Sequence, residues 1–233
     1  MMDKLFKAGA HFAYTKSRRH PSAKPFIFGS KNKIEIFDLE KTKDLLEAAK
    51  NFIGSVAETG GMILFVGGKN EALTAVKNAA VSIGMPYVAG RWIGGTLTNF
   101  PQIRKRVMKL EELLKQKEKG ELVKYTKKER LLIDRDIEKL QKFFSGLAPM
   151  KELPKAVFVI DSKREYIAAK EANALDIPVV SLSGSDCDLK EITYPIPGND
   201  SAMGSIQFFV SEIVSAYKNG LAKKEKVKAP DSK

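Results

Sequence analysis

The chain has 233 residues, of which 43% are hydrophobic, and a formal net charge of +12 at pH 7. This apolar fraction can bury a sizeable core, which excludes a wholly disordered chain. The single cysteine, Cys187, cannot form an internal disulfide, and no apolar run reaches the ~20 residues of a membrane span. We therefore expect a soluble protein of a reducing compartment, the cytoplasm.

The positive charge is concentrated in three segments. Residues 1–33 carry eight basic residues against one acidic residue, residues 101–145 carry fourteen against eight, and residues 218–233 carry six against two. The remainder of the chain is therefore mildly acidic. Basic segments around an acidic body indicate a nucleic-acid partner, because lysines kept only for solubility would be scattered.

Residues 1–33 form a predicted basic arm. A short helix is expected over residues 1–8, and the prolines, glycines and dispersed aromatic residues that follow argue against regular structure. Arginine and lysine contact phosphates, and aromatic rings stack on unpaired bases. The alternative is that the aromatic rings pack on the body while the charges are merely solvated. The RNA-binding candidates here are Lys16, Arg18, Arg19, Lys24, Lys31 and Lys33.

Short apolar runs alternate with helical periodicity on both sides of residues 101–145. Strands are predicted over residues 34–37, 62–66, 86–89, 156–160 and 178–182, with amphipathic helices between and after them. This alternation predicts a doubly wound, mostly parallel five-stranded sheet in a discontinuous α/β domain of residues 34–100 and 146–220. Gly220 is expected to stop the last helix, leaving residues 221–233 as a flexible basic tail.

Residues 101–145 form a predicted insertion. Apolar residues step by four, three and four along two segments separated by Gly120, which predicts an antiparallel coiled-coil hairpin with arms of roughly 22–30 Å. Thr126 and Glu129 fit a capping box at the start of the second helix. Basic residues cluster at the end that joins the body, which an ordinary solvated face does not explain; they are Arg104, Lys105, Arg106 and Lys109.

The sequence contains no combination of catalytic acid, base and nucleophile. Its two histidines, His11 and His20, both lie in the arm, and acidic neighbours of Cys187 would raise its thiol pKa. Asp161, at the end of a strand, resembles a catalytic carboxylate but equally serves helix entry, where Ser162 and Glu165 fit a capping box. We predict no cofactor and no metal, although Asp186 and Asp188 with His11 offer ligands for a divalent ion.

Two other classes of function stay open at this point. One is an enzyme dependent on a nucleotide or sugar phosphate, with its ligand beyond the carboxyl ends of the strands. The other is an interaction module whose hairpin binds a protein helix. The first predicts turnover that is lost on Asp161→Asn, and the second predicts binding that is lost with the hairpin.

The segment GRWIGGTLTNF, residues 90–100, joins the domain to the insertion. Its glycines permit a sharp backbone path. The side chains of Arg91, Thr96 and Asn99 are donors suited to phosphate and sugar oxygens. Trp92 can stack on a base or fill the core. Two readings follow: the segment contacts RNA directly, or it only seats the hairpin.

Five motifs resemble one family in order and spacing: GAHFxxxxxRR, KPFIFGSKNKIEIFDLEKT, GRWIGGTLTNF, FVIDSKREYIAAKEANALDIPVV and IPGNDSAM. It is the family of the second protein of the small ribosomal subunit, in its bacterial form. The resemblance implies a flavodoxin-like domain with a protruding coiled-coil hairpin and a structural, non-enzymatic role. It also implies binding to ribosomal RNA and neighbouring ribosomal proteins near the junction of head and body.

The resemblance assigns RNA contacts residue by residue, and this chain departs from the family at two places. Ala13 and Tyr14 stand where many relatives have Gly-His, which weakens metal ligation there, and the tail is shorter and more basic than in many relatives. The RNA contacts carried over are Arg18, Arg19, Lys31, Lys33, Arg91, Trp92, Thr96 and Asn99.

Overall fold

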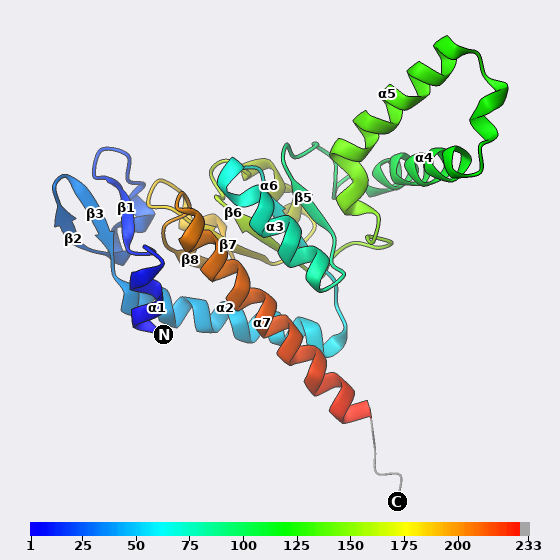
Figure 1. The fold of residues 1–233 in the computed structure, drawn as a ribbon. Coiled ribbons are helices and arrows are strands. Elements are labelled where there is room, and N and C mark those ends of the chain that lie inside the picture. Colours follow the sequence, from blue (N-terminus) through cyan, green and yellow to red (C-terminus); the bar gives the residue numbers. More distant parts are fainter. Residues whose placement is uncertain (229–233) are drawn as a thin grey trace, which may run out of the picture.

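The computed structural model describes residues 1–228. An α/β body forms the centre of the molecule, a helical hairpin projects from one end, and a small antiparallel sheet lies at the other (Figure 1). No helix of residues 1–228 combines the length and the apolar character that crossing a membrane requires. The molecule thus presents two extensions separated by one packed body.

The body contains the predicted five-stranded parallel sheet, in the order β5-β4-β6-β7-β8. The strands are β4 (Ile63–Gly67), β5 (Tyr87–Ala89), β6 (Ala156–Ile160), β7 (Val179–Ser183) and β8 (Tyr194–Pro197). One predicted member was wrong, because residues 34–37 lie in another sheet and β8 takes the fifth place. Pro195 and Pro197 disguise β8 in the sequence, and an edge strand tolerates proline because one of its sides needs no N–H donors.

Helices cover both faces of this sheet, which confirms the doubly wound fold. One face packs on α2 (Leu39–Thr59), α3 (Asn70–Ser82) and α7 (Met203–Lys228). The other face packs on α6 (Tyr166–Ala174), the joining segment and the base of the hairpin. Alternate residues of each strand enter opposite cores, Phe65 on one side and Leu64 on the other, so the central strands are buried on both faces.

The N-terminal arm is more regular than its sequence suggests. After α1 (Met2–Lys7) come β1 (Phe12–Thr15), the 3-10 helix η1 (Pro21–Phe26), β2 (Ile27–Lys31) and β3 (Ile34–Phe37). These strands form an antiparallel sheet in the order β1-β3-β2. Asn32 and Lys33 connect β2 to β3 with φ of 51° and 68°, the conformation of a two-residue hairpin turn. The prediction of an irregular arm was wrong because this turn lacks the glycine that usually marks it.

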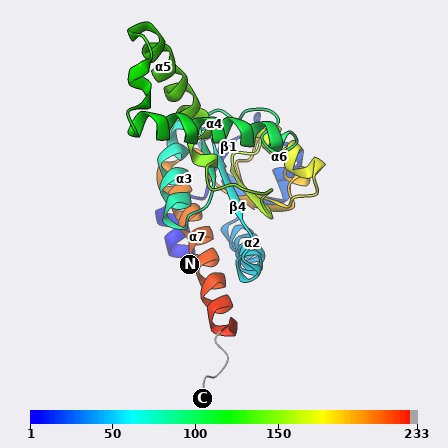
Figure 2. The same cartoon turned by 90° about the vertical axis from the view of Figure 1, so that its right-hand side faces the viewer.

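Residues 101–145 form the two helices that their periodicity predicts. They are α4 (Phe100–Glu118) and α5 (Lys127–Phe144), connected by η2 (Glu121–Lys124) and followed by η3 (Ser145–Leu147). Gly120 takes φ of 71° at the turn, and Thr126 and Glu129 form the predicted capping box. Leu110, Ile137 and Leu140 form a small core between the helices. Both views show the pair projecting from the body (Figures 1 and 2), while the supercoil of a coiled coil stays a prediction.

The last helix does not stop at Gly220. It continues to Lys228, and a Cβ at Gly220 would lie 2.4 Å from the carbonyl oxygen of Gly54. Gly220 therefore allows α7 to pack closely on α2, and the part of the predicted tail up to residue 228 is helical. The rest of that tail lies outside the described residues. The short η4 (Leu189–Glu191) precedes β8.

Candidate nucleic-acid interface

The joining segment is wrapped around one carboxylate, that of Glu171 on α6. Oε1 accepts hydrogen bonds from the Trp92 indole (3.1 Å) and the Gly95 amide (2.7 Å). Oε2 accepts from the Leu97 amide (3.0 Å), the Thr98 amide (3.2 Å) and the Thr98 hydroxyl (3.1 Å). Burial acts to raise the pKa of Glu171, but these donors outweigh it and lower that pKa. Glu171 is thus a charged centre that fixes the path of the chain into the hairpin.

Two of the predicted RNA contacts in this segment are buried. Trp92 is 7% exposed and Thr96 is 1% exposed, and the Thr96 hydroxyl donates to the carbonyl oxygen of Ile93. Their burial supports the reading in which they seat the hairpin and argues against direct contact with RNA. Arg91 and Asn99 are exposed, and Asn99 precedes the first residue of α4. Nothing in the sequence of α6 marked Glu171, since a glutamate within a helix is usually solvated.

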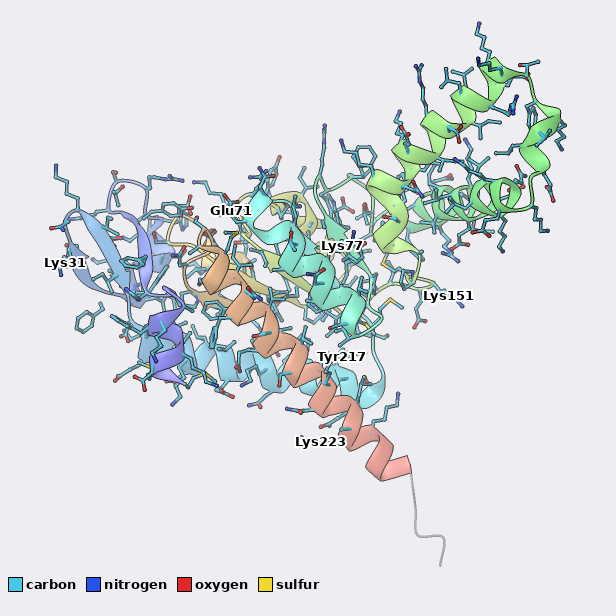
Figure 3. The ribbon with its side chains drawn as sticks, in the orientation of Figure 1. Lys31, Glu71, Lys77, Lys151, Tyr217 and Lys223 are labelled. Atoms are coloured by element: carbon cyan, nitrogen blue, oxygen red, sulfur yellow. The ribbon has the colours of Figure 1, made fainter. Side chains whose placement is uncertain are left out.

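The cations of the N-terminal arm divide into internal and outward-facing groups. Arg19 donates to Oε1 of Glu35 at 2.6 Å, and both side chains are largely buried. Arg18 is exposed, although it contacts Asp186 (3.2 Å) and lies over the Tyr14 ring. The other predicted contacts are exposed and form no ion pair within residues 1–224: Lys16, Lys24, Lys31 and Lys33. Lys31 lies at the outer end of the small sheet (Figure 3).

The four cations at the base of α4 also divide. Arg104 is half-buried and donates to the carbonyl oxygen of Ala148, and Lys109 pairs with Asp136 of α5. These two side chains thus hold the hairpin together. Lys105 and Arg106 are exposed and pair with no acid among residues 1–224. They remain available to an external anion.

The carboxyl ends of the strands hold a buried ionic cluster of Lys69, Asp161 and Asp200. Nζ of Lys69 lies 2.7 Å from Asp161 Oδ2 and 3.0 Å from Asp200 Oδ2. Burial acts to lower the pKa of Lys69, but the two carboxylates raise it above its usual value. Oδ1 of Asp161 accepts from the amides of Lys163 and Arg164, so its carboxylate stabilises the turn that leads from β6 to α6. The predicted capping box of Ser162 and Glu165 is wrong, because α6 begins only at Tyr166.

The only described group with metal-ligand geometry is Asp161, Cys187 and Asp200, and the ammonium of Lys69 lies between its carboxylates. Burial, with Asp161 and Asp200, raises the pKa of the Cys187 thiol to about 12, so the thiol is neutral at pH 7. The direction matches the sequence prediction, but different acids cause it.

The ion site offered by His11, Asp186 and Asp188 does not form. The His11 ring stacks on the Phe6 ring, with centroids 4.4 Å apart, and lies at a tilt to the Phe12 ring, with centroids 4.1 Å apart. Asp186 instead pairs with Arg18 and Lys163. Asp188 accepts from the amide of Lys190.

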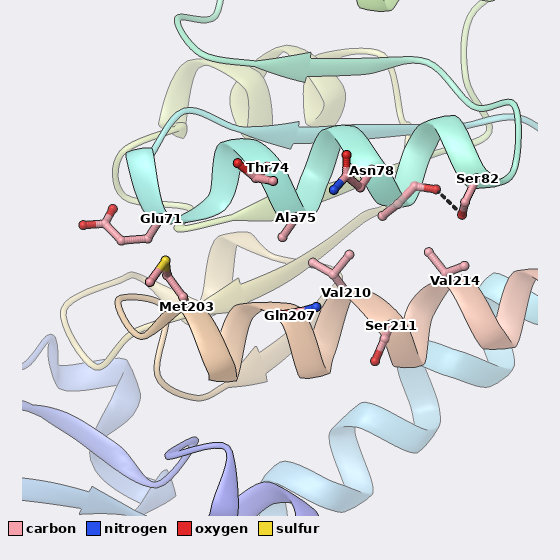
Figure 4. Close-up of a pocket in the computed structure, with 11 residues that line it drawn as sticks. Glu71, Thr74, Ala75, Asn78, Ser82, Met203, Gln207, Val210, Ser211 and Val214 are labelled. Atoms are coloured by element: carbon pink, nitrogen blue, oxygen red, sulfur yellow. Dashed lines mark hydrogen bonds between the residues drawn. The ribbon is translucent and has the colours of Figure 1, made fainter.

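A groove of about 510 Å³ lies between α3 and α7 (Figure 4). The groove is lined by Met203 and Val210 and by small, hydroxyl and amide side chains. Glu71 is its one charged lining residue. This groove does not suit a polyanion, because its one charged lining residue is an acid.

Comparison with known proteins gives one consistent result. The family model described as ribosomal protein S2 matches residues 5–220. Curated relatives described as small ribosomal subunit protein uS2 include that of Sulfurimonas denitrificans, 43% identical over 95% of this chain and 85% of the relative. The relative from Nitratiruptor sp. is 45% identical over 94% of this chain and 82% of the relative. The relative from Acidothermus cellulolyticus is 41% identical over 100% of this chain and 85% of the relative.

Proposed function

The chain belongs to the ribosomal protein S2 family, and on this premise we propose that it binds small-subunit ribosomal RNA through cations at both ends of the molecule. The family is a structural, non-enzymatic component of the small ribosomal subunit, so the reading as a nucleotide-dependent enzyme does not apply. The predicted cytoplasmic location follows from this family.

The first proposed contact is the small sheet at the N-terminal end. Lys31 is the last residue of β2 and Lys33 is the second residue of the tight turn to β3, and both are exposed. A rigid hairpin turn presents its lysines at fixed positions, which lowers the entropy lost when they meet phosphates. Lys16, Arg18 and Lys24 extend this cationic surface.

The second proposed contact is the joint between body and hairpin. Arg91, Asn99, Lys105 and Arg106 are exposed there. Glu171 fixes the backbone that carries Arg91 and Asn99, so the body sets the position of this surface relative to the small sheet. The mechanism is positional: two cationic surfaces held by one packed core neutralise phosphates of separate RNA segments. Neighbouring ribosomal proteins, near the junction of head and body, complete the proposed environment.

One observation carries this proposal. Many cations of the body and hairpin pair with acids, as Lys50 does with Glu212 and Lys117 with Asp134. Apart from Arg18, which contacts Asp186, the cations of the two surfaces are exposed without such partners among residues 1–224. Unpaired cations gathered at two sites repel each other, and a polyanion relieves that repulsion.

The test is binding of the full chain to small ribosomal subunits that lack it. We expect Lys31→Glu with Lys33→Glu, and separately Lys105→Glu with Arg106→Glu, to weaken binding and to lower the salt dependence by about one log unit per lost phosphate contact. Lys43→Glu with Lys218→Glu makes the same change in net charge at exposed positions elsewhere. Equal binding by all three double variants would refute the two surfaces.

A further inference from the structure

A polar cleft of about 400 Å³ lies where the base of the hairpin meets the body. Its walls come from α3, from the end of the edge strand β5 and from the last turns of α5. Figure 1 shows these elements meeting below the hairpin, and Figure 3 marks Lys77 on α3. Residues far apart in the sequence thus share one hollow that no sequence motif had indicated.

The floor of this cleft is held tightly. Gly146, just after α5, lies against β5 so closely that a Cβ on it would be 2.2 Å from the Tyr87 carbonyl oxygen. The other end of the hairpin is fixed by Glu171 through the joining segment. Because both ends of the hairpin are seated on the body, the last turns of α5 are held beside β5 and α3.

Three cations from three different elements line the cleft: Lys77, Arg91 and Lys142. All three are exposed, and none forms an ion pair within residues 1–224. Glu138 is the one acidic residue in the lining, and it too forms no such pair. The cleft therefore carries a net charge of about +2, and its cations have no internal partner that explains their gathering.

Aromatic side chains stand among these cations. Tyr87 and Phe143 line the same cleft and are each half-buried, and Nζ of Lys142 lies 5.7 Å from the centroid of the Phe143 ring. Cations bind phosphates, while partly exposed rings stack on unpaired bases. An acidic protein segment would use the cations alone, so the mixture favours a nucleic acid.

We propose that this cleft holds the backbone of a single-stranded or bulged RNA segment, with phosphates on Lys77, Arg91 and Lys142. This proposal rests on the proposed binding to ribosomal RNA and adds a third contact to it. Lys77 and Lys142 lie outside the sequence motifs of the family resemblance and were not among the residues predicted from the sequence to bind RNA.

The test combines affinity with cross-linking, using the full chain and small ribosomal subunits that lack it. The double variant Lys77→Glu with Lys142→Glu, which leaves Arg91 of the joint unchanged, is compared with the exposed control Lys43→Glu with Lys218→Glu. In parallel, Lys142→Cys and, as control, Lys43→Cys carry a photoreactive label. The native Cys187 is 0% exposed and does not compete for the label.

We expect the Lys77→Glu, Lys142→Glu variant to bind about tenfold or more weakly, with a salt dependence lower by about 2 log units per log unit of salt, since each lost phosphate contact removes about one. The label at position 142 should cross-link to ribosomal RNA, and the label at position 43 should not. If the wild type binds but the two double variants match, or if position 142 cross-links only to protein, the cleft proposal is overturned and the proposed function stands. If the wild type shows no salt-dependent binding, both fall.

Discussion

The indole Nε1 of Trp92 donates a hydrogen bond to Oε1 of Glu171, 79 residues further along the chain, over 3.1 Å. This bond ties the start of the inserted hairpin to a helix that follows it in the sequence. The same carboxylate accepts four more hydrogen bonds from Gly95, Leu97 and Thr98. One side chain therefore connects the two halves of a discontinuous body at the point where the chain leaves it.

The first prediction concerns Glu171→Gln. Glutamine has nearly the same size as glutamate, but one of the two acceptor oxygens is replaced by an NH₂ group, which can only donate. Donors of the joining segment then lose their partner, and we expect a loss of about 1–3 kcal/mol in the free energy of unfolding. Urea unfolding followed by the fluorescence of Trp92, the only tryptophan, measures both stability and local order. Glu191→Gln, at an exposed position, is the control. Equal losses of stability in the two variants would show that the Glu171 carboxylate does not stabilise the joining segment.

The second prediction is a pH dependence of the same contact. The pKa of Glu171 in the folded protein lies below its ordinary 4.5. Its stabilising contribution is therefore fully present above pH 4.5 and is lost as the pH falls through the folded-state pKa. The difference in unfolding free energy between wild type and Glu171→Gln should shrink as urea unfolding is repeated from pH 7 down to pH 3. A constant difference over that range would contradict a charged carboxylate at the joint.

The sequence predicts well what depends on local pattern. Helical spacing in α2 to α7 and the apolar runs of β4, β6 and β7 reflect burial within single elements, so periodicity finds them. It fails where a partner comes from a distant segment. The sequence alone suggests that Arg19 is a surface cation, because its partner Glu35 comes beside it only in the folded protein. The prolines of β8 argue against a strand in the sequence, and they are tolerated because β8 lies at the edge of the sheet. The cleft beside Lys77 and Lys142 likewise exists only once the hairpin returns to the body.

The third prediction separates the two adjacent arginines of the arm. Arg19→Glu would place two carboxylates together in a largely buried position, because Glu35 is 3% exposed, and we expect a loss of about 3–5 kcal/mol in unfolding free energy. Arg18→Glu changes an exposed side chain and should cost less than about 1 kcal/mol. Thermal and urea unfolding of the two variants measure the contrast.

The pair also has a rescue control. Adding Glu35→Arg to Arg19→Glu restores opposite charges and should recover part of the lost stability, as expected for residues in direct contact. If Arg19→Glu is as stable as Arg18→Glu, the Arg19–Glu35 pair does not support the fold. In that case the double variant Arg18→Glu with Arg19→Glu would report on RNA binding alone. We expect instead that this double variant also loses stability, because it breaks the Arg19–Glu35 pair.

The last prediction concerns the buried ammonium of Lys69. Lys69→Met removes the cation that separates Asp161 from Asp200 and leaves two carboxylates in a buried site, so we expect a loss of about 3–5 kcal/mol at pH 7. Burial, together with Asp161, already raises the pKa of Asp200, and losing Lys69 should raise it further. A folded-state pKa above the unfolded value means that the variant binds a proton on folding. Its stability should therefore recover as the pH falls from 7 toward 5, where the wild type gains less. Urea unfolding from pH 7 to pH 5 measures the free energy of unfolding of Lys69→Met, with Lys43→Met as the exposed control. If Lys69→Met loses further stability as the pH falls, Asp161 and Asp200 do not repel each other in the variant.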